Sequence, residues 1–336
     1  MNKKRIVFLL PPYSGLPTRS VRCMQFKNDF RGGYQFVAYD LASKFRSRYK
    51  LYDKFLRYTW GVFILVKLVL ISRQVWRVVL IKNTNITLQK IIYFFFKGRC
   101  ALDINDPIHL QFDNKHTQEL FLNTDLLILE NQSLLNCYES LNPNIVVNED
   151  YPYTEDLQVG SSVRENIILW YGSKETVFHL EKITSIIQKV LDNSEYRMVL
   201  LGVNKLPKGL KNKVSILENY DYKILKSNLK KCKIVLAPFK DTQDALLRGN
   251  MKAKIGMASG ACVVAEDVAM HQKIIKSKLN GLLCSDKDTW LNTLMNLVHD
   301  DKKIKKISSN ALEYSCINFT KKKYISTLIN ALESLK

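Results

Sequence analysis

Two neighbouring stretches in the C-terminal half decide the fold of this chain. The first reads Ile234-Val-Leu-Ala-Pro-Phe-Lys-Asp241, and the second reads Leu247-Arg-Gly-Asn-Met-Lys-Ala-Lys-Ile-Gly-Met-Ala-Ser-Gly-Ala-Cys-Val-Val-Ala265. The pattern predicts a buried strand, a loop, a helix over 250–259 and a second buried strand over 261–265. The start of this helix is rich in hydrogen-bond donors: Arg248, Asn250, Lys252 and Lys254. Such a helix start suits a phosphate group, although a solvated basic helix end has the same pattern.

The same alternation of short apolar runs and helical segments continues through the rest of the chain. We expect further strands at 6–10, 34–39, 78–81, 100–104, 125–129, 145–147, 167–170, 197–201 and 214–217. Strands separated by helices form parallel β-α-β units. The fold class is therefore expected to be α/β, with two Rossmann-like, doubly wound domains that face a cleft.

The polar, acidic segment 148–164 contains Pro152 and Gly160 and is typical of an interdomain linker. We expect an N-terminal domain over 1–150 and a C-terminal domain over 165–318. A last helix at 319–336 is expected to be able to cross back to the N-terminal domain.

The charge is concentrated in one part of the chain. The 336 residues carry a formal net charge of +20, and residues 41–100 hold thirteen basic residues against the single acid Asp53. A field of this strength requires a polyanion: nucleic acid, an anionic membrane or a phosphorylated substrate. Aromatic residues are interleaved with the basic ones over 44–77, as in helices that lie on anionic membranes, although a sheet-covering helix with a solvated basic side remains an alternative. Nucleic acid is the weaker alternative, because the sequence has no recognisable nucleic-acid-binding signature.

The cysteines and the apolar runs exclude several protein classes. Seven scattered cysteines without a C-x-x-C pair argue against a disulfide framework and against a zinc site. The longest apolar run, 61–71, is too short to span a bilayer. We expect a cytoplasmic protein, peripheral on the inner face of the cell membrane.

Two further turns are able to approach a phosphate. In Tyr171-Gly-Ser-Lys174, Gly172 permits close backbone approach, and Ser173 and Lys174 are potential donors. A tight turn with a capping serine is the structural alternative. The N-terminal counterpart is the loop that ends at Gly15, before the Thr-Arg-Ser-Val-Arg run at 18–22.

Together these stretches resemble the GT-B glycosyltransferases, in particular the retaining bacterial family (glycosyl transferases group 1) that builds surface polysaccharides. The resemblance is strongest from Ile167 to Cys284, where the runs quoted above occur in the order found in that family. It implies a UDP- or GDP-linked sugar donor in the C-terminal domain and a glycan or lipid-linked glycan acceptor in the N-terminal domain. It implies neither a metal nor another cofactor, and it points to synthesis of lipopolysaccharide, O-antigen or capsule.

The resemblance also suggests roles for individual residues. Gly172 and Ser173 match the phosphate-facing turn, and Arg248, Asn250 and Lys252 match the cationic helix start beside the diphosphate. Arg248 and Lys252 are the catalytic candidates that would stabilise the leaving diphosphate. Asp103 and Asp106 would orient or deprotonate an acceptor hydroxyl, unless they only cap the next turn.

The sequence departs from the family in one respect. Many relatives carry two glutamates where this chain has Leu247 and Ile255. Asp241 and Asp244 are potential replacements, and His109 and His116 are candidate cleft histidines by location alone. The departure leaves open a second hypothesis, a non-catalytic GT-B-like subunit of a glycan-assembly complex.

Overall fold

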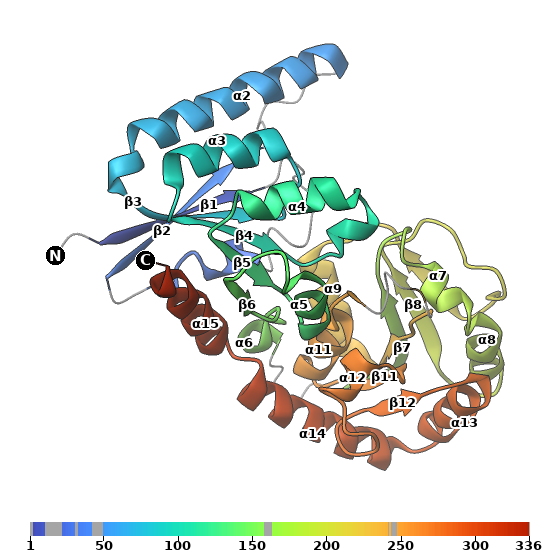
Figure 1. Cartoon of the computed structure of the whole chain (residues 1–336). Coiled ribbons are helices and arrows are strands. Elements are labelled where there is room, and N and C mark those ends of the chain that lie inside the picture. Colours follow the sequence, from blue (N-terminus) through green and yellow to red (C-terminus); the bar gives the residue numbers. More distant parts are fainter. Residues whose placement is uncertain are drawn as a thin grey trace. The chain divides into compact units, whose positions relative to one another are not determined.

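The computed structural model describes residues 3–10, 22–30, 33–41, 50–157, 163–240, 242 and 247–335, with the backbone alone at 50–58. They form two compact units, each built on a six-stranded sheet (Figure 1). Unit 1 comprises Met1–Tyr151, Leu247–Gly249 and Lys321–Lys336, and unit 2 comprises Pro152–Leu246 and Asn250–Thr320. The expected helix at the C-terminus belongs to unit 1, whereas three residues of the decisive stretch, Leu247–Gly249, leave unit 2 and join unit 1.

Every strand pair of both sheets is parallel, which confirms the α/β class with two doubly wound sheets. The first sheet has the order β2-β1-β3-β4-β5-β6. Its strands are β1 (Lys4–Leu10), β2 (Tyr34–Asp40), β3 (Val75–Ile81), β4 (Cys100–Ile104), β5 (Leu126–Leu129) and β6 (Ile145–Val147). The order reverses between β1 and β3, so a ligand site is expected beyond the carboxyl ends of these two strands.

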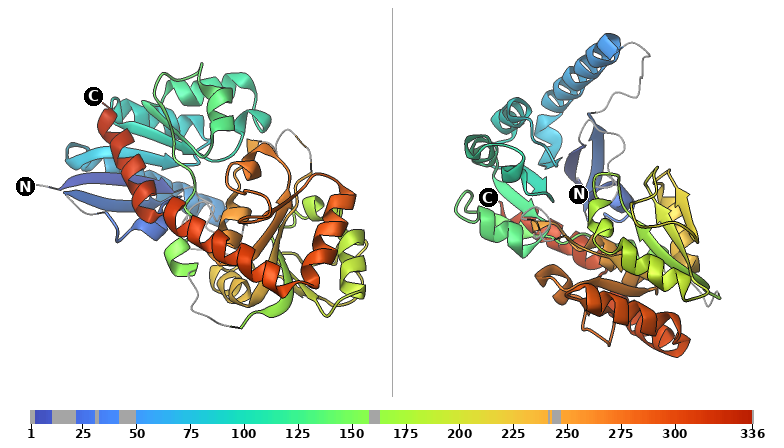
Figure 2. Two further views of the ribbon diagram at one scale, coloured as in Figure 1. Left: turned by 90° about the horizontal axis from the view of Figure 1, so that it is seen from below. Right: turned by 90° about the vertical axis from the view of Figure 1, so that its right-hand side faces the viewer.

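Alternating side chains of the first sheet enter two separate cores. Val7 and Leu9 join a cluster with the helices on one face, and Ile6 and Phe8 join a second cluster on the other. The first face is covered by α2 (Lys50–Leu70), α3 (Ile86–Phe96), α4 (Asn114–Leu122) and α5 (Gln132–Tyr138) (Figures 1 and 2). The second face is covered by α15 (Lys321–Ser334) and by the segment around a 3-10 helix, Met24–Phe26. The C-terminal helix is therefore part of the core of unit 1.

The second sheet has the order β12-β11-β10-β7-β8-β9. Its strands are β7 (Glu165–Tyr171), β8 (Arg197–Leu201), β9 (Val214–Leu217), β10 (Cys232–Ala237), β11 (Cys262–Glu266) and β12 (Leu282–Cys284). The order reverses between β7 and β10, which is the arrangement of dinucleotide-binding sheets.

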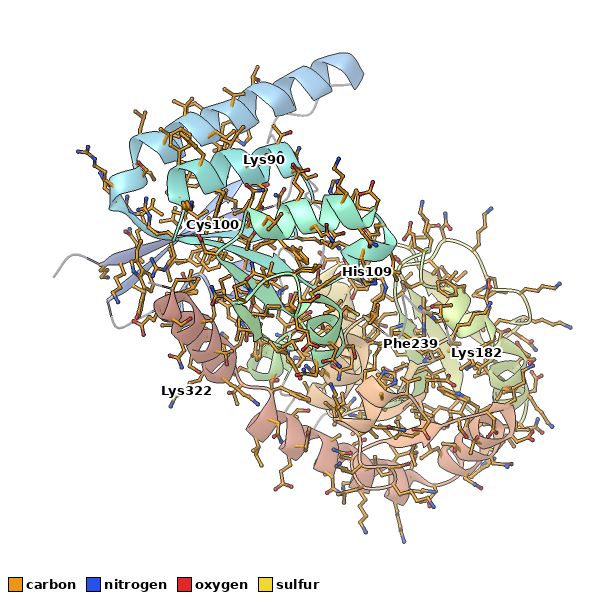
Figure 3. All side chains as sticks on the ribbon, viewed as in Figure 1. Lys90, Cys100, His109, Lys182, Phe239 and Lys322 are labelled. Atoms are coloured by element: carbon orange, nitrogen blue, oxygen red, sulfur yellow. The ribbon has the colours of Figure 1, made fainter. Side chains whose placement is uncertain are left out.

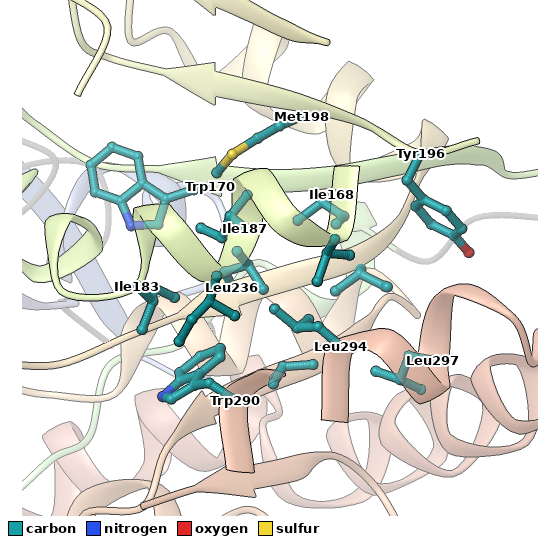
Figure 4. Packing of buried hydrophobic residues seen from close by; sticks show 14 of the residues in the cluster. Ile168, Trp170, Ile183, Ile187, Tyr196, Met198, Leu236, Trp290, Leu294 and Leu297 are labelled. Carbon is teal, nitrogen blue, oxygen red and sulfur yellow. The ribbon is translucent and has the colours of Figure 1, made fainter. Parts of the chain in front are cut away.

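Two layers of helices enclose the second sheet. One core contains Trp170, Trp290 and Leu236 (Figure 4) and lies against α8 (Thr184–Asp192), α13 (Lys287–Val298) and α14 (Asp301–Asn318). On the opposite face lie α9 (Tyr222–Lys231) and α11 (Met251–Ala258). Gly256 lets α11 approach the sheet closely, since a Cβ there would lie 2.8 Å from Val263 and 3.1 Å from Val235.

The sequence-based elements differ from the structure mainly in short pieces. Between β7 and β8 lie two helices, α7 (Phe178–Glu181) and α8, and the described part of the basic stretch 44–77 contains the long helix α2. The expected linker contains a helical turn, α6 (Thr154–Leu157). The strand β12 and the turn α12 (Ala269–Gln272) were not expected, because runs of three or four residues carry too little periodicity.

Candidate functional site

In unit 2, the polar groups of interest gather where β7 and β10 end. β7 ends at Tyr171 and is followed at once by Gly172 and Ser173. An added Cβ at Gly172 would lie 2.7 Å from Thr176 Oγ1 and 2.8 Å from the Trp170 ring. At Gly202, which follows β8 with φ +93°, it would overlap the carbonyl oxygen of Gly172. Both positions require glycine, so two backbone turns lie packed together at this edge of the sheet.

The turn after β7 is closed by a threonine. The N–H of Ser173 donates to Thr176 Oγ1 over 3.1 Å, and this hydroxyl donates back to Ser173 O over 3.0 Å. The Ser173 amide is thus already paired, while the side chains of Ser173 and Lys174 are exposed. The structural alternative expects a serine as the cap, whereas the capping side chain is that of Thr176. A hydrogen bond from the Ser173 side chain lowers the pKa of Glu175, so of these two side chains Lys174 is the one that forms no hydrogen bond within the described part of the chain.

Lys252 lies in the first turn of α11 and reaches back to the end of β7. Its Nζ atom lies 4.5 Å from the ring centroid of Trp170 and 5.9 Å from that of Tyr171. The Tyr171 hydroxyl donates to the Lys252 carbonyl over 2.8 Å. Burial lowers the pKa of Lys252 to about 7. The aromatic faces stabilise the ammonium group when Lys252 is protonated. An anion bound next to this half-buried lysine would favour its protonated form.

The other donors expected at this helix start have different surroundings. Asn250 is buried, and its Nδ2 donates to Met270 O over 2.9 Å, so it connects the start of α11 to α12. Lys254 is 1% exposed, with Nζ 5.2 Å from the Phe319 ring centroid. The structure therefore separates Lys254 from Lys252 and favours a packing role for Lys254.

A charged and aromatic network that the sequence reasoning missed lies at the ends of β10 and β11. Lys182 Nζ pairs with Glu266 Oε1 at 2.7 Å and donates to Phe239 O at 3.0 Å (Figure 3). The Phe239 ring is stacked on His179 with centroids 4.7 Å apart and meets His271 edge-on at 5.6 Å. The one signal in the sequence was the carboxylate of Glu266 at the end of an otherwise apolar strand.

His271 is held as a neutral imidazole. Its Nδ1 lies 2.8 Å from Glu266 O, and since a carbonyl only accepts, Nδ1 carries the proton. Burial, with the charge of Lys252 as a smaller cause, lowers the pKa of His271 to about 4. This histidine therefore stays uncharged at neutral pH.

In unit 1, Asp103 is enclosed within the sheet. It is 1% exposed on β4, and Arg22 Nε donates to its Oδ1. Arg22 Nη1 also donates to Asp150 Oδ1 over 2.6 Å. Burial raises the pKa of Asp103 to about 6, against the lowering effect of Arg22. These contacts favour a structural role for Asp103 over proton transfer to a substrate.

Asp106 lies beyond the end of β4, where the chain turns. Its Oδ2 forms an ion pair with Lys82 Nζ, and its Oδ1 lies 3.2 Å from Arg248 Nη1. Lys82 follows β3 in the left-handed backbone region, with φ 48°. The structure therefore brings two sequence-predicted candidates, Asp106 and Arg248, into one ion pair and places Arg248 in unit 1.

The remaining candidates have the following positions. His109 follows Asp106 closely, and its Nδ1 lies 2.8 Å from the Tyr138 hydroxyl, whereas His116 Nε2 lies 2.9 Å from Thr84 O. Leu247 packs against the core of unit 1, and Ile255 is buried in α11. Gly15, Asp241 and Asp244 lie outside the described residues. Among the described residues, no group of three His, Cys, Asp or Glu side chains could hold a metal ion.

Comparison with protein-family models and with curated protein sequences finds no match. Solved structures do match. Anabaena HepE in complex with UDP and glucose superposes with a TM-score of 0.70 at 13% identity, over 99% of this chain and 100% of that chain. A Rickettsia africae glycosyltransferase has a TM-score of 0.67 at 13% identity, over 100% and 99%. TarM from S. aureus has a TM-score of 0.64 at 15% identity, over 83% of this chain and 58% of that chain.

At these identities the likeness concerns the fold. The fold is shared along nearly the whole chain with HepE and with the Rickettsia glycosyltransferase. The chain has a GT-B-like fold of two Rossmann-like sheets.

Proposed function

We propose that this protein is a glycosyltransferase that moves a sugar from a UDP- or GDP-linked donor to a glycan or lipid-linked glycan acceptor during surface-polysaccharide synthesis. One observation carries the proposal: a lysine with a lowered pKa and an aromatic support, Lys252, stands where the strand order of a dinucleotide-type sheet reverses. The fold shared with HepE, whose structure contains UDP-glucose, supports the same donor class.

In the proposed reaction, the bond between the anomeric carbon and the diphosphate oxygen breaks, and a bond to an acceptor oxygen forms. The acceptor hydroxyl loses its proton, and the nucleoside diphosphate leaves with added negative charge. Protonated Lys252 would stabilise that charge. Of the two carboxylates predicted for the acceptor side, Asp106 is the remaining candidate for the base that takes this proton, because Asp103 is enclosed by Arg22; Asp106 is itself buried and paired with Lys82 and Arg248.

Isothermal titration of the purified chain with UDP and with GDP tests the donor site. Lys252→Met should weaken binding by about tenfold or more, because charged hydrogen bonds to phosphate contribute roughly 1.5–3 kcal/mol. Lys189→Met, at an exposed lysine of α8, is the matched control and should bind as the wild type does. If neither nucleotide binds the wild type, or if Lys252→Met binds unchanged, the donor assignment is wrong.

A non-catalytic subunit of a glycan-assembly complex is the second candidate. It is favoured by the apolar, packed side chains of Leu247 and Ile255 at the two positions where the resembled family carries glutamates. Release of UDP or GDP from a nucleotide-sugar in the presence of a glycan acceptor would contradict this candidate. Nucleotide binding without turnover, on any glycan or lipid-linked acceptor offered, would favour it.

We further propose that unit 1 contacts an anionic membrane. The described part of the structure has no helix long and apolar enough to cross a bilayer. Among the α2 residues whose side chains are described, four are nevertheless apolar and exposed on one side of the helix, including Phe63 at 55% and Leu70 at 79%. Val62 and Val66 complete this surface. An apolar stripe beside basic residues is typical of a helix that lies in the membrane interface.

Several basic residues of this stretch are occupied by contacts within the protein and are therefore poor candidates for binding anionic lipid. Arg77 donates to the carbonyls of Leu332 and Leu335, and Arg99 donates to those of Ser72 and Val75. Lys82 and Lys90 form ion pairs with Asp106 and Glu119. Exposed Lys67, Arg73 and Lys97 remain as candidates among the described residues, and Lys67 lies on α2 itself.

Sedimentation with vesicles tests the membrane proposal. The wild type should bind vesicles containing phosphatidylglycerol, less at high salt, and Phe63→Ser with Leu70→Ser should reduce the bound fraction several-fold. Replacing exposed Leu122 on α4 by serine is the matched control. Equal binding to neutral vesicles would refute the electrostatic part, and binding to a single-stranded oligonucleotide in preference to vesicles would favour nucleic acid.

A further inference from the structure

The helix α3 has an apolar side that the described part of unit 1 leaves uncovered. Phe94 is 79% exposed and Phe95 is 40% exposed, and their rings meet edge to face with centroids 5.1 Å apart. Ile91, one turn earlier, is exposed as well. Aromatic rings left in water forgo the free energy of burial, so this phenylalanine pair at the end of a helix indicates a contact surface.

The exposed sides of α2 and α3 both point away from one face of the first sheet. Leu68 of α2 and Phe96 of α3 are buried in a single hydrophobic cluster on that face. Because the two helices turn their buried sides to the same cluster, their opposite sides both face outward (Figures 1 and 2). Half of the large apolar side chains that are exposed in the described part of the chain lie on these two helices, four on α2 and three on α3.

A single guanidinium joins the C-terminal ends of the two helices. Arg99 Nη1 donates to Ser72 O over 3.2 Å and to Val75 O over 2.9 Å, just after α2. Its Nη2 donates to Phe95 O over 3.3 Å, in the last turn of α3. The two helices also end where the neighbouring parallel strands β3 and β4 begin. The end of α2, with its exposed Leu70, therefore lies next to the phenylalanine pair.

Two exposed cations flank this junction. Arg73 lies in the 3-10 turn that follows α2, and Lys97 directly follows α3. No acidic residue occurs in the sequence from 54 to 102. We call the three apolar side chains Leu70, Phe94 and Phe95, together with these two cations, the α2–α3 corner.

An anionic phospholipid matches both parts of the α2–α3 corner. Its acyl chains accept the apolar side chains, and its phosphate pairs with the cations. A nucleic acid would pair with the cations but would leave Leu70 without apolar cover. A purely apolar protein surface would remove Arg73 and Lys97 from water without giving them a partner. The composition of the corner therefore favours lipid.

We propose that the α2–α3 corner is the point at which unit 1 enters an anionic phospholipid bilayer, with its three apolar side chains among the acyl chains and its two cations at the headgroup phosphates. The inference rests on the proposed membrane contact of α2 and adds α3 to it. A single inserted helix can still turn about its own axis. Two helix ends that Arg99 holds together fix the orientation of unit 1 on the membrane.

Sedimentation with phosphatidylglycerol vesicles tests the apolar part of the corner. Phe94→Ser with Phe95→Ser should reduce the bound fraction at least about threefold, because two partly exposed rings no longer leave water. Ile317→Ser, at a 69% exposed residue of α14 in unit 2, is the matched control and should bind as the wild type does. If the double variant also binds as the wild type does, the corner is overturned, even where Phe63→Ser with Leu70→Ser loses binding.

Tryptophan quenching tests insertion without removing an apolar group. Phe94→Trp should lose more fluorescence than the wild type on phosphatidylglycerol vesicles whose acyl chains carry bromine, because bromine quenches only rings that reach the hydrocarbon. Ile317→Trp should show no such increase. Quenching of Phe94→Trp no greater than that of Ile317→Trp would overturn the insertion.

A charge-matched pair of variants tests the headgroup contact. Arg73→Gln with Lys97→Gln should weaken binding to phosphatidylglycerol vesicles at least about tenfold, since each cation near an anionic surface contributes roughly fivefold. Lys189→Gln with Lys305→Gln removes the same charge at exposed positions of unit 2 and should have a much smaller effect. Equal effects of the two pairs would show that net charge alone matters, which would overturn the role of Arg73 and Lys97.

These measurements separate the failure of the corner from that of the proposed function. A wild type that binds no anionic vesicle would overturn the corner together with the membrane contact of α2, whereas titration with UDP and GDP tests the donor site without any membrane. A wild-type dimer that Phe94→Ser dissociates in sedimentation velocity, with vesicle binding unchanged, would assign the corner to a second copy of this chain and overturn the lipid assignment.

Discussion

The ammonium nitrogen of Lys252 lies 4.5 Å from the centroid of the Trp170 ring, at the end of the strand where the order of the second sheet reverses. The lysine comes from the start of one helix and the tryptophan from the centre of the unit's core. Their contact therefore places a titratable cation on a rigid support. The indole nitrogen of Trp170 is buried without a hydrogen-bond partner, so the ring face makes the polar contact here.

Nucleotide affinity should depend on pH through Lys252. Its pKa, lowered to about 7 by burial, means that the ammonium form is lost as the pH rises above neutrality. UDP affinity of the wild type should fall between pH 7 and pH 9, whereas Lys252→Met should show weaker binding with little change over this range. Calorimetric titration at several pH values measures both. A wild-type profile as flat as that of the variant would contradict the role of Lys252.

Lys252 should also make the stability of the protein depend on pH. Stability should rise with pH, whereas nucleotide affinity should fall. Between the folded pKa of about 7 and the ordinary value of 10.5, the unfolded chain binds more protons, so stability contributed by this residue rises with pH. Lys252→Met should raise the melting temperature at pH 6.5 and lose this advantage by pH 10. Thermal unfolding without ligand provides the measurement. A melting-temperature difference that stays constant with pH would show that the lysine titrates normally.

Buried His271 should make the protein acid-sensitive. Burial lowers its pKa from 6.5 to about 4, so the unfolded chain takes up a proton that the folded chain does not. Its contribution is complete above pH 6.5 and is lost as the pH falls towards 4, by up to about 3 kcal/mol. His271→Gln should show a shallower loss of stability over this range in urea titrations. His299→Gln, at an exposed histidine, should keep the wild-type slope.

Alanine substitutions at two glycines with positive φ should distinguish the cost of backbone strain from the cost of steric overlap. Gly202 has φ +93° and no room for a Cβ beside the Gly172 carbonyl, whereas Gly33 has φ +97° and open space around it. Gly33→Ala should cost roughly 1–2 kcal/mol from backbone strain alone. Gly202→Ala should cost clearly more in chemical unfolding, because the turn must also move. Equal costs would mean that the two turns are not closely packed.

Asp103→Asn separates a structural carboxylate from a catalytic one. Removing one partner of the buried Arg22 pair should destabilise unit 1 by about 3–5 kcal/mol. Sugar transfer should fall only in proportion to the loss of folded protein. A stable Asp103→Asn variant with greatly reduced kcat would instead restore Asp103 as a catalytic residue.

Much of the fold could be predicted from the sequence, because it is written in local patterns. Buried parallel strands are continuous apolar runs, such as 233–237 and 197–201, and these agree with β10 and β8 to within one residue. Short elements escaped prediction because their pattern is too brief. Residues 282–284, for example, become a strand only by pairing with the edge strand β11.

The arrangement of the candidate site could be predicted from the sequence only in part. The sequence by itself determined the residue types at each strand end and helix start, including Gly172, Lys252 and Asp106, because strand ends are readable from periodicity. Only the tertiary structure decided which of them share surroundings. It separated Lys254 from Lys252, enclosed Asp103 with Arg22, and brought Arg248 to Asp106 across more than a hundred residues of chain. The physical reason is that side-chain direction, burial and ion pairing depend on contacts distant in sequence, which no local pattern records.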